Sequence, residues 1–172
     1  TGVGSFEGAK VRIDPSGQIV VATGATGHGQ GHETIFAQIA ADLWGVSPED
    51  VRLVEGDTSS IQFGCGTFGS RSTVNVGSAL FEASALLKEK VLLLAAHLLE
   101  ASRDDLELGN GKVFIRGMPQ RSLAFSELAR AAVPGWASKL PAGLEPGLEE
   151  TFYFVPATVT WANAAHVAVI EV

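Results

Sequence analysis

The spacing of apolar residues along the chain predicts alternating strands and helices. Residues 10–14 and 18–23 are expected to be half-buried strands, joined by a Pro-Ser-Gly turn into a hairpin. Residues 51–55 and 151–155 are further apolar runs of strand length. The closing residues 166–172 are also expected to form a strand.

Three segments have apolar residues at the three- and four-residue spacing of an amphipathic helix. The first spans residues 32–44 and is followed by Gly45, a residue type that often ends helices. A long helix is predicted over about residues 76–101, and a short one over residues 126–132. The inner face of the long helix is expected to carry Leu80, Ala83, Leu87, Val91, Leu94 and Leu98.

A second hairpin completes the expected fold. Residues 105–108 and 113–115 flank Gly109-Asn110-Gly111, a sequence typical of a tight hairpin turn. The resulting order, β-β-α-β-α-β-β-α-β-β, predicts a mixed α+β fold in which helices pack against a mixed sheet. With 172 residues, of which 46% are hydrophobic and 18% charged, residues 1–172 are expected to form a single domain.

Two glycine- and hydroxyl-rich loops each lead directly into a predicted helix. Residues 24–34 read Gly-Ala-Thr-Gly-His-Gly-Gln-Gly-His-Glu-Thr, and residues 64–73 read Gly-Cys-Gly-Thr-Phe-Gly-Ser-Arg-Ser-Thr. A helix N-terminus has unpaired backbone N–H groups and a partial positive charge, so such a loop can bind phosphates or a heteroatom-rich cofactor. Two such loops in a short chain suggest two walls of one site.

The side chains in these loops suit a polar ligand. Gln30 carries both a hydrogen-bond donor and an acceptor, and Thr67, Ser70 and Ser72 supply hydroxyls. Arg71 offers a planar charged fork that suits phosphate. Simpler interpretations stay open: the first loop can be a flexible turn, and the second a hydroxyl-rich helix cap with Arg71 paired to Glu or Asp. Neither loop has the Walker or the dinucleotide-binding spacing.

No catalytic or metal site is predicted from the side chains alone. His28 and His32 are four residues apart, but the glycines between them disfavour the regular helix that would bring both onto a zinc ion. Cys65, the only cysteine, has no His or acidic partner nearby in the sequence, and no pair of carboxylates has acid–base spacing.

Charge and hydropathy exclude two other classes of function. The chain has 12 Lys and Arg against 19 Asp and Glu, a formal net charge of −7, whereas nucleic-acid binding calls for a basic face. The most apolar stretch, residues 91–99, is too short to span a bilayer and is expected to be a buried part of the long helix.

Two motifs in order along the chain resemble the molybdenum hydroxylases, the family of xanthine dehydrogenase, aldehyde oxidase and aerobic carbon monoxide dehydrogenase. The first is Gly-Gln-Gly-His-Glu-Thr at residues 29–34, followed by Ala-Gln-Ile-Ala at residues 37–40. The second is Gly-Thr-Phe-Gly-Ser-Arg-Ser-Thr at residues 66–73, and residues 51–58 between them fit the same pattern. The combination is most similar to the large subunit of the carbon monoxide dehydrogenase type.

This resemblance implies a molybdenum–pterin cofactor, expected here as molybdopterin cytosine dinucleotide. The metal is held by the dithiolene of that cofactor, so the resemblance implies no protein ligand to it. The residues that the resemblance places against the cofactor are Gly29, Gln30, Gly31, His32, Thr67, Phe68, Gly69, Ser70, Arg71 and Ser72.

The resemblance also implies that the chain is one part of a much longer oxidoreductase subunit. It corresponds to the first part of the second molybdenum-cofactor-binding region, and the catalytic glutamate of the family lies in a later segment. We therefore expect no catalytic residue in this chain and no activity of the chain alone. The expected partners are the remainder of the large subunit and the iron–sulfur and flavin subunits or domains, in the cytoplasm.

Two alternative functions stay open on the sequence. A domain of the same fold can serve assembly or interaction without catalysis. A phosphate-ligand-binding domain of an unrelated class, such as a nucleotide-dependent transferase, would also account for the two loops.

Overall fold

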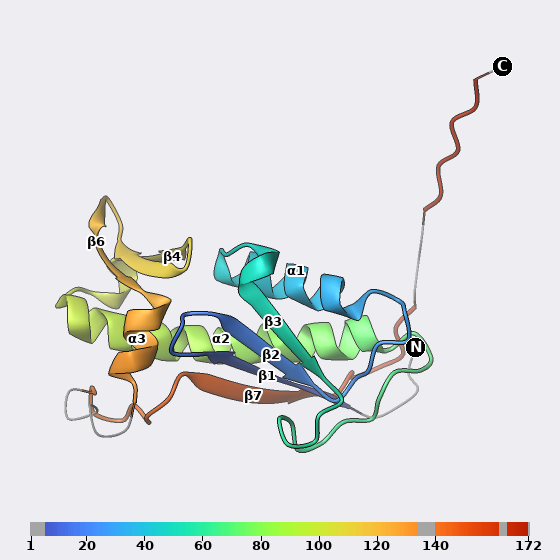
Figure 1. Ribbon diagram of the computed structural model, residues 1–172, viewed down its shortest axis with the longest axis horizontal. Helices are drawn as coiled ribbons and strands as arrows, with labels where there is room; N and C mark the ends of the chain where they lie inside the picture. Colours follow the sequence, from blue (N-terminus) through green and yellow to red (C-terminus); the bar gives the residue numbers. More distant parts are fainter. Residues whose placement is uncertain (1–5, 134–139, 162–164, 172) are drawn as a thin grey trace.

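The centre of the molecule is a four-stranded sheet in the order β3-β2-β1-β7 (Figure 1). β1 (Glu7–Ile13) and β2 (Ile19–Thr23) form the predicted antiparallel hairpin, and β7 (Glu149–Phe154) pairs antiparallel with β1. β3 (Val51–Glu55) lies parallel to β2, so the sheet is mixed as predicted. The computed structural model describes residues 6–133, 140–161 and 165–171.

Two helices pack against this sheet (Figure 1). α1 (His32–Trp44) has the predicted bounds and ends at Gly45, whose φ of 62° is left-handed. α2 (Ser72–Leu99) begins at Ser72 rather than near residue 76. Its first turn holds Ser72 and Asn75, which are buried although they are polar. The apolar pattern used for the prediction begins only after these residues, so the predicted helix started too late.

A second, three-stranded sheet lies at one end of the molecule in the order β4-β5-β6 (Figure 1). β4 (Leu106–Gly109) and β5 (Lys112–Ile115) form the second predicted hairpin. β6 (Met118–Ala124) is a strand that the sequence did not predict, because its first half is exposed and has no apolar alternation. α3 (Phe125–Ala131) follows it directly. Short 3-10 helices at Pro48–Asp50 and Arg103–Asp105 precede β3 and β4.

The predicted order of elements therefore needs two corrections. β6 adds a strand before α3, and residues 166–171 of the predicted last strand are not in a strand. Those residues have the composition of a strand, but a strand also needs a neighbour to supply its hydrogen bonds. In Figure 1 they extend away from the sheet, so none of the described strands pairs with them. The prediction for residue 172 lies outside the described residues.

The core lies between α2 and the sheet. Leu80 and Leu87 of α2 and Val11 of β1 are fully buried in one cluster. Trp44, at the end of α1, is also fully buried, and its indole N–H donates to Ser84 Oγ of α2 at 3.2 Å. This packing places the N-termini of α1 and α2 at the same end of the sheet (Figure 1), which is where the two glycine-rich loops lie.

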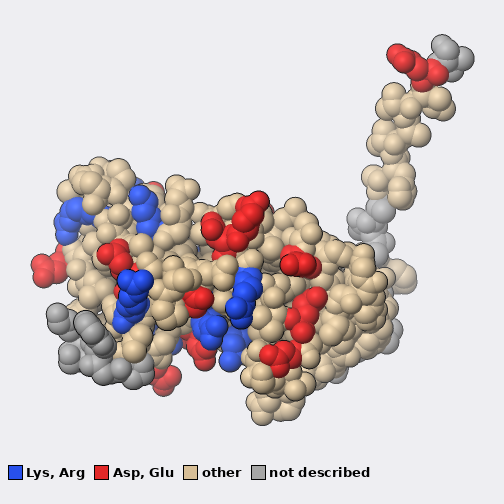
Figure 2. All heavy atoms as spheres, viewed as in Figure 1, with Lys and Arg blue, Asp and Glu red and all other residues tan. Residues whose placement is uncertain are grey.

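The surface agrees with the charge balance of the sequence. On the face shown in Figure 2, Lys and Arg side chains are interspersed with Asp and Glu and form no continuous basic area. In the described part of the chain, no helix has the length and apolar character to cross a membrane.

The core predicts the effect of truncating one α2 side chain. Leu87→Ala should lower the free energy of unfolding by about 2–5 kcal/mol, because it leaves a cavity against the sheet. Leu93→Ala on the exposed side of the same helix should change it by less than about 0.5 kcal/mol. Urea unfolding followed by circular dichroism measures both, and equal losses would contradict the assigned core.

Candidate functional site

The first loop connects β2 to α1 through a backbone that only glycine adopts readily. Gly29 and Gly31 have φ of 100° and 78°, and a side chain added at either would meet no atom within 4 Å. Their backbone is thus open to a ligand. Gly31 is also the N-cap of α1, and its carbonyl accepts a hydrogen bond from the N–H of Ile35 at 3.0 Å.

The second loop enters α2 through another series of left-handed residues. Gly66, Gly69 and Ser70 have φ of 88°, 58° and 54°, and Ser70 is one of few non-glycine residues with this conformation. A side chain added at Gly66 would again meet nothing within 4 Å. Both loops therefore present backbone at a helix N-terminus, the arrangement that favours anions.

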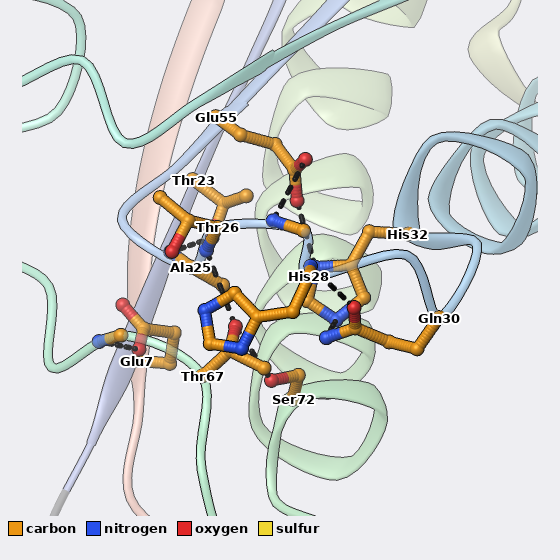
Figure 3. Close-up of polar contacts among 12 residues, drawn as sticks. Glu7, Thr23, Ala25, Thr26, His28, Gln30, His32, Glu55, Thr67 and Ser72 are labelled. Atoms are coloured by element: carbon orange, nitrogen blue, oxygen red, sulfur yellow. Dashed lines mark hydrogen bonds and ion pairs between the residues drawn. The ribbon is translucent and has the colours of Figure 1, made fainter.

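The two loops are in direct contact. The N–H of Thr26 donates to Thr67 Oγ1 at 3.2 Å, and Ser72 Oγ lies 3.1 Å from the same oxygen (Figure 3). At the base of the loops, a Cβ added at Gly24 would lie 2.5 Å from the Cα of Gly64, so neither position has room for a side chain. Residues some forty positions apart in sequence thus form one structural unit.

A cavity of about 730 Å³ lies between the loops, so residues of both loops line one pocket, and its use as a binding site stays a prediction. Its size is that of a typical ligand site. All the predicted site residues except Gly29 and Gly31 line it. Four further residues line it that were not predicted, namely His28, Ile35, Thr73 and Val74. Ile35 and Val74 are apolar residues near helix starts, where they look like core residues in the sequence. The lining residues are His28, Gln30, His32, Ile35, Thr67, Phe68, Gly69, Ser70, Arg71, Ser72, Thr73 and Val74.

Arg71 is held by an acid whose role the sequence does not indicate. The Glu7 carboxylate in β1 is fully buried and lies 2.8 Å from Nη1 of Arg71, which is itself 1% exposed. The same carboxylate accepts the backbone N–H groups of Cys65 and Gly66 at 3.2 Å. Arg71 in turn donates to the carbonyls of Gly66 and Phe6. Glu7 is remote in sequence, and a lone acid in a strand gives no signal of such a role.

The ion pair with Glu7 distinguishes between the two roles that the sequence allowed for Arg71, contact with phosphate and pairing with an acid. Of the two interpretations that the sequence left open, pairing with an acid is what the structure shows. The guanidinium lies beneath the loop, 5.1 Å from the centre of the Phe68 ring. A direct contact of Arg71 with a phosphate stays a prediction, and its present role is to fix the backbone of the second loop.

His32 and Glu55 form a second polar group against the first loop (Figure 3). His32 is 4% exposed, and its Nδ1 lies 2.7 Å from Glu55 Oε1 at the end of β3. Glu55 Oε2 accepts the N–H of Gly27 at 3.2 Å. On the other side of the ring, His32 Nε2 lies 3.0 Å from the carboxamide nitrogen of Gln30. The sequence predicted a role for Gln30 and His32, but it assigned none to Glu55.

A tight turn after β3 leads the chain toward the second loop. Asp57 accepts the N–H and hydroxyl of Ser59 at 2.9 and 2.6 Å and the hydroxyl of Ser60 at 2.8 Å. These hydrogen bonds stabilise the carboxylate and lower the pKa of Asp57. The Asp57 turn therefore orders the segment that connects Glu55 to the second loop.

The site has few groups suited to acid–base or metal chemistry. Cys65 is a half-buried free thiol whose backbone, rather than its sulfur, makes the contact with Glu7. In the ranges that the structure describes, no cluster of three His, Cys, Asp or Glu residues is suited to a metal ion. What the site offers is a set of hydrogen-bond donors and acceptors on a rigid, glycine-rich backbone.

Comparison with known proteins gives consistent matches. A family model described as the molybdopterin cofactor-binding domain matches residues 1–172. The chain is 37% identical to the carbon monoxide dehydrogenase large chain of Afipia carboxidovorans, over 99% of this chain and 21% of that protein. It is 33% identical to the nicotine 6-hydroxylase large subunit of Paenarthrobacter nicotinovorans, over 95% of this chain and 20% of that protein.

Solved structures agree with these matches. Reconstituted CO dehydrogenase from Oligotropha carboxidovorans superimposes with a TM-score of 0.76 at 38% identity, over 91% of this chain and 19% of that one. Quinoline 2-oxidoreductase from Pseudomonas putida 86 gives a TM-score of 0.77 at 36% identity, over 90% and 20%. The mixed α+β fold is therefore confirmed, and the chain spans about a fifth of the length of the relatives it matches.

The buried ion pair predicts a large effect from removing one partner. Glu7→Ala should lower the free energy of unfolding by about 3–5 kcal/mol, because it leaves the Arg71 charge and two loop N–H groups buried and unpaired. Glu150→Ala, which removes a partly exposed ion pair with Lys90, should lower it by less than about 1 kcal/mol. Chemical unfolding of both variants tests this, and a Glu7→Ala effect as small as the control would refute it.

Proposed function

The chain belongs to the molybdopterin cofactor-binding domain family, and on that premise we propose that its two loops bind the pterin of a molybdenum cofactor. The observation that carries the proposal is the single cavity between the loops, with Gln30 on one wall and the hydroxyls of Thr67, Ser72 and Thr73 on the other. A pterin is a fused heterocycle with many hydrogen-bond donors and acceptors, and this cavity offers both kinds of group.

The residues of the site fit such a group in three respects. The backbone at Gly29, Gly31 and Gly66 is open, because a Cβ added at any of them would meet no atom within 4 Å, so a ligand can approach the amides closely. α1 and α2 direct their N-termini toward the loops, where they stabilise phosphate. Phe68 is 45% exposed at the cavity, which leaves an aromatic face beside a ring-shaped ligand.

When bound, the cofactor would supply the redox centre for oxidative hydroxylation with water-derived oxygen, or for oxidation of carbon monoxide. The residues of this chain would bind and orient it: Gln30 and the loop amides through hydrogen bonds, and the second loop through hydroxyls held in place by Glu7 and Arg71. The protein supplies position and electrostatics, and the cofactor supplies the chemistry.

We further propose that the chain is the first part of the second cofactor-binding region of a long large subunit. Relatives named for carbon monoxide, nicotine and quinoline all match this same stretch, although their substrates differ. A shared stretch among proteins with different substrates supports a role toward the shared cofactor. The catalytic glutamate, the substrate contacts and the iron–sulfur and flavin partners would then lie outside residues 1–172, and the chain alone would be inactive.

Removing the carboxamide of Gln30 tests cofactor binding. The longer subunit that carries this chain is purified, and its molybdenum content is measured by mass spectrometry. Gln30→Ala should weaken cofactor binding by roughly three- to tenfold through the loss of one hydrogen bond, and lower the molybdenum content accordingly. Gln38→Ala on the exposed side of α1 is the matched control and should leave the content unchanged.

Two outcomes would count against the proposal. A parent subunit that contains no molybdenum or pterin would favour a non-catalytic assembly module of the same fold. Equal molybdenum content in the Gln30→Ala variant and the parent would show that the Gln30 side chain does not contribute to cofactor binding. Acid release of the nucleotide then tests the finer proposal: CMP supports the cytosine dinucleotide form, and GMP or no nucleotide contradicts it.

A further inference from the structure

We propose that Glu55 and His32 are positioning residues that fix the orientation of the Gln30 carboxamide, and so decide which of its groups face the ligand. The identity of the ligand rests on the proposed function. The hydrogen-bond order, meaning which atom donates and which accepts in each contact, follows from the described residues alone. Four contacts establish that order, and the direction of each follows from the one before it (Figure 3).

The first contact fixes the carboxamide. The backbone N–H of His28 lies 2.5 Å from Oε1 of Gln30. A backbone N–H can only donate, so the atom that faces it must be the carboxamide oxygen and not the NH₂ group. Exchanging the two ends of the carboxamide would place two donors against each other. The orientation of Gln30 is therefore determined by the backbone of its own loop.

The second contact fixes the proton on His32. With the oxygen of Gln30 committed to His28, its nitrogen lies 3.0 Å from Nε2 of His32. A carboxamide nitrogen can only donate, so Nε2 of the ring must accept. In the third contact, the ring proton of a neutral His32 is therefore on Nδ1, which lies 2.7 Å from the acceptor Oε1 of Glu55.

The fourth contact ends the series on the loop where it began. The second oxygen of Glu55 accepts the N–H of Gly27 at 3.2 Å, next to the His28 N–H at the other end. His32 is 4% exposed and packs against Phe36, with ring centres 5.0 Å apart, so solvent does not readily replace these partners. The series of hydrogen bonds therefore runs from Gly27 through Glu55, His32 and Gln30 to His28, the neighbour of Gly27. The donor and the acceptor of each hydrogen bond are defined.

As a consequence, the donor end and the acceptor end of the Gln30 carboxamide have fixed positions at the cavity wall. One N–H of Gln30 donates to His32 and one lone pair of its oxygen accepts from His28, which leaves one N–H and one lone pair for a ligand. A carboxamide without these partners would present either end. A heterocycle with an adjacent donor and acceptor, such as a pterin ring, is thus recognised in one orientation only.

Nitrogen-15 NMR of the His32 ring in the 172-residue chain tests the hydrogen-bond order without any cofactor. At neutral pH we expect a protonated Nδ1 and an unprotonated Nε2. Gln30→Glu replaces the donor with a carboxylate that can only accept, so Nε2 should become protonated. The control Gln38→Glu adds the same charge on the exposed side of α1 and should leave the ring resonances unchanged. A parent ring protonated on Nε2, or a Gln30→Glu variant with unprotonated Nε2, would overturn the proposal.

A double-substitution experiment in the longer subunit tests whether Glu55 acts through Gln30. Glu55→Gln has one acceptor oxygen for two donors, Gly27 and His32, so it should disrupt the series and lower cofactor affinity by roughly three- to tenfold. In a Gln30→Ala background the same change should have almost no further effect. A full additional loss in that background would show a merely structural role and overturn the inference. Absence of cofactor from the parent would overturn the proposed function instead, and the NMR result would still decide the hydrogen-bond order.

Discussion

The geometry of the site depends on the buried ion pair between Glu7 and Arg71. Burying two charges is costly unless they are paired and the remaining lone pairs and protons are used. Here the carboxylate also accepts two backbone N–H groups of the second loop, and the guanidinium also donates to carbonyls on both sides. The pair therefore fastens the second loop to the first strand of the sheet. Without Glu7, the N–H groups of Cys65 and Gly66 would lose their acceptor, and the second loop would lose this link to β1.

Close backbone contact extends this constraint to the first loop. Gly24 and Gly64 approach so closely that neither can carry a side chain, and Thr67 bonds to the N–H of Thr26. The first loop is in turn held from beneath by Glu55 and His32, which reach it from β3 and α1. Each wall of the cavity is thus supported by a carboxylate from a strand, and the ligand-facing groups are left on pre-positioned backbone.

Much of this could be predicted from the sequence, for identifiable reasons. α1 and the two hairpins follow from apolar spacing and turn residues, and the loop residues follow from motif resemblance. β6 could not be predicted, because its exposed first half has no alternating pattern. Residues 166–171 have a strand-like pattern but no neighbour among the described strands. Glu7 and Glu55 could not be predicted because their roles depend on contacts between residues far apart in sequence, which no local pattern records.

The most direct test of the proposed site is a crystal structure of the longer subunit purified with its bound cofactor. We predict electron density for a pterin in the cavity between the loops, within hydrogen-bonding distance of Gln30 and of the hydroxyl-rich stretch from Thr67 to Thr73. We also predict that Glu7 and Arg71 stay paired beneath the second loop. Density for the pterin at a place that neither loop contacts would contradict the proposed site.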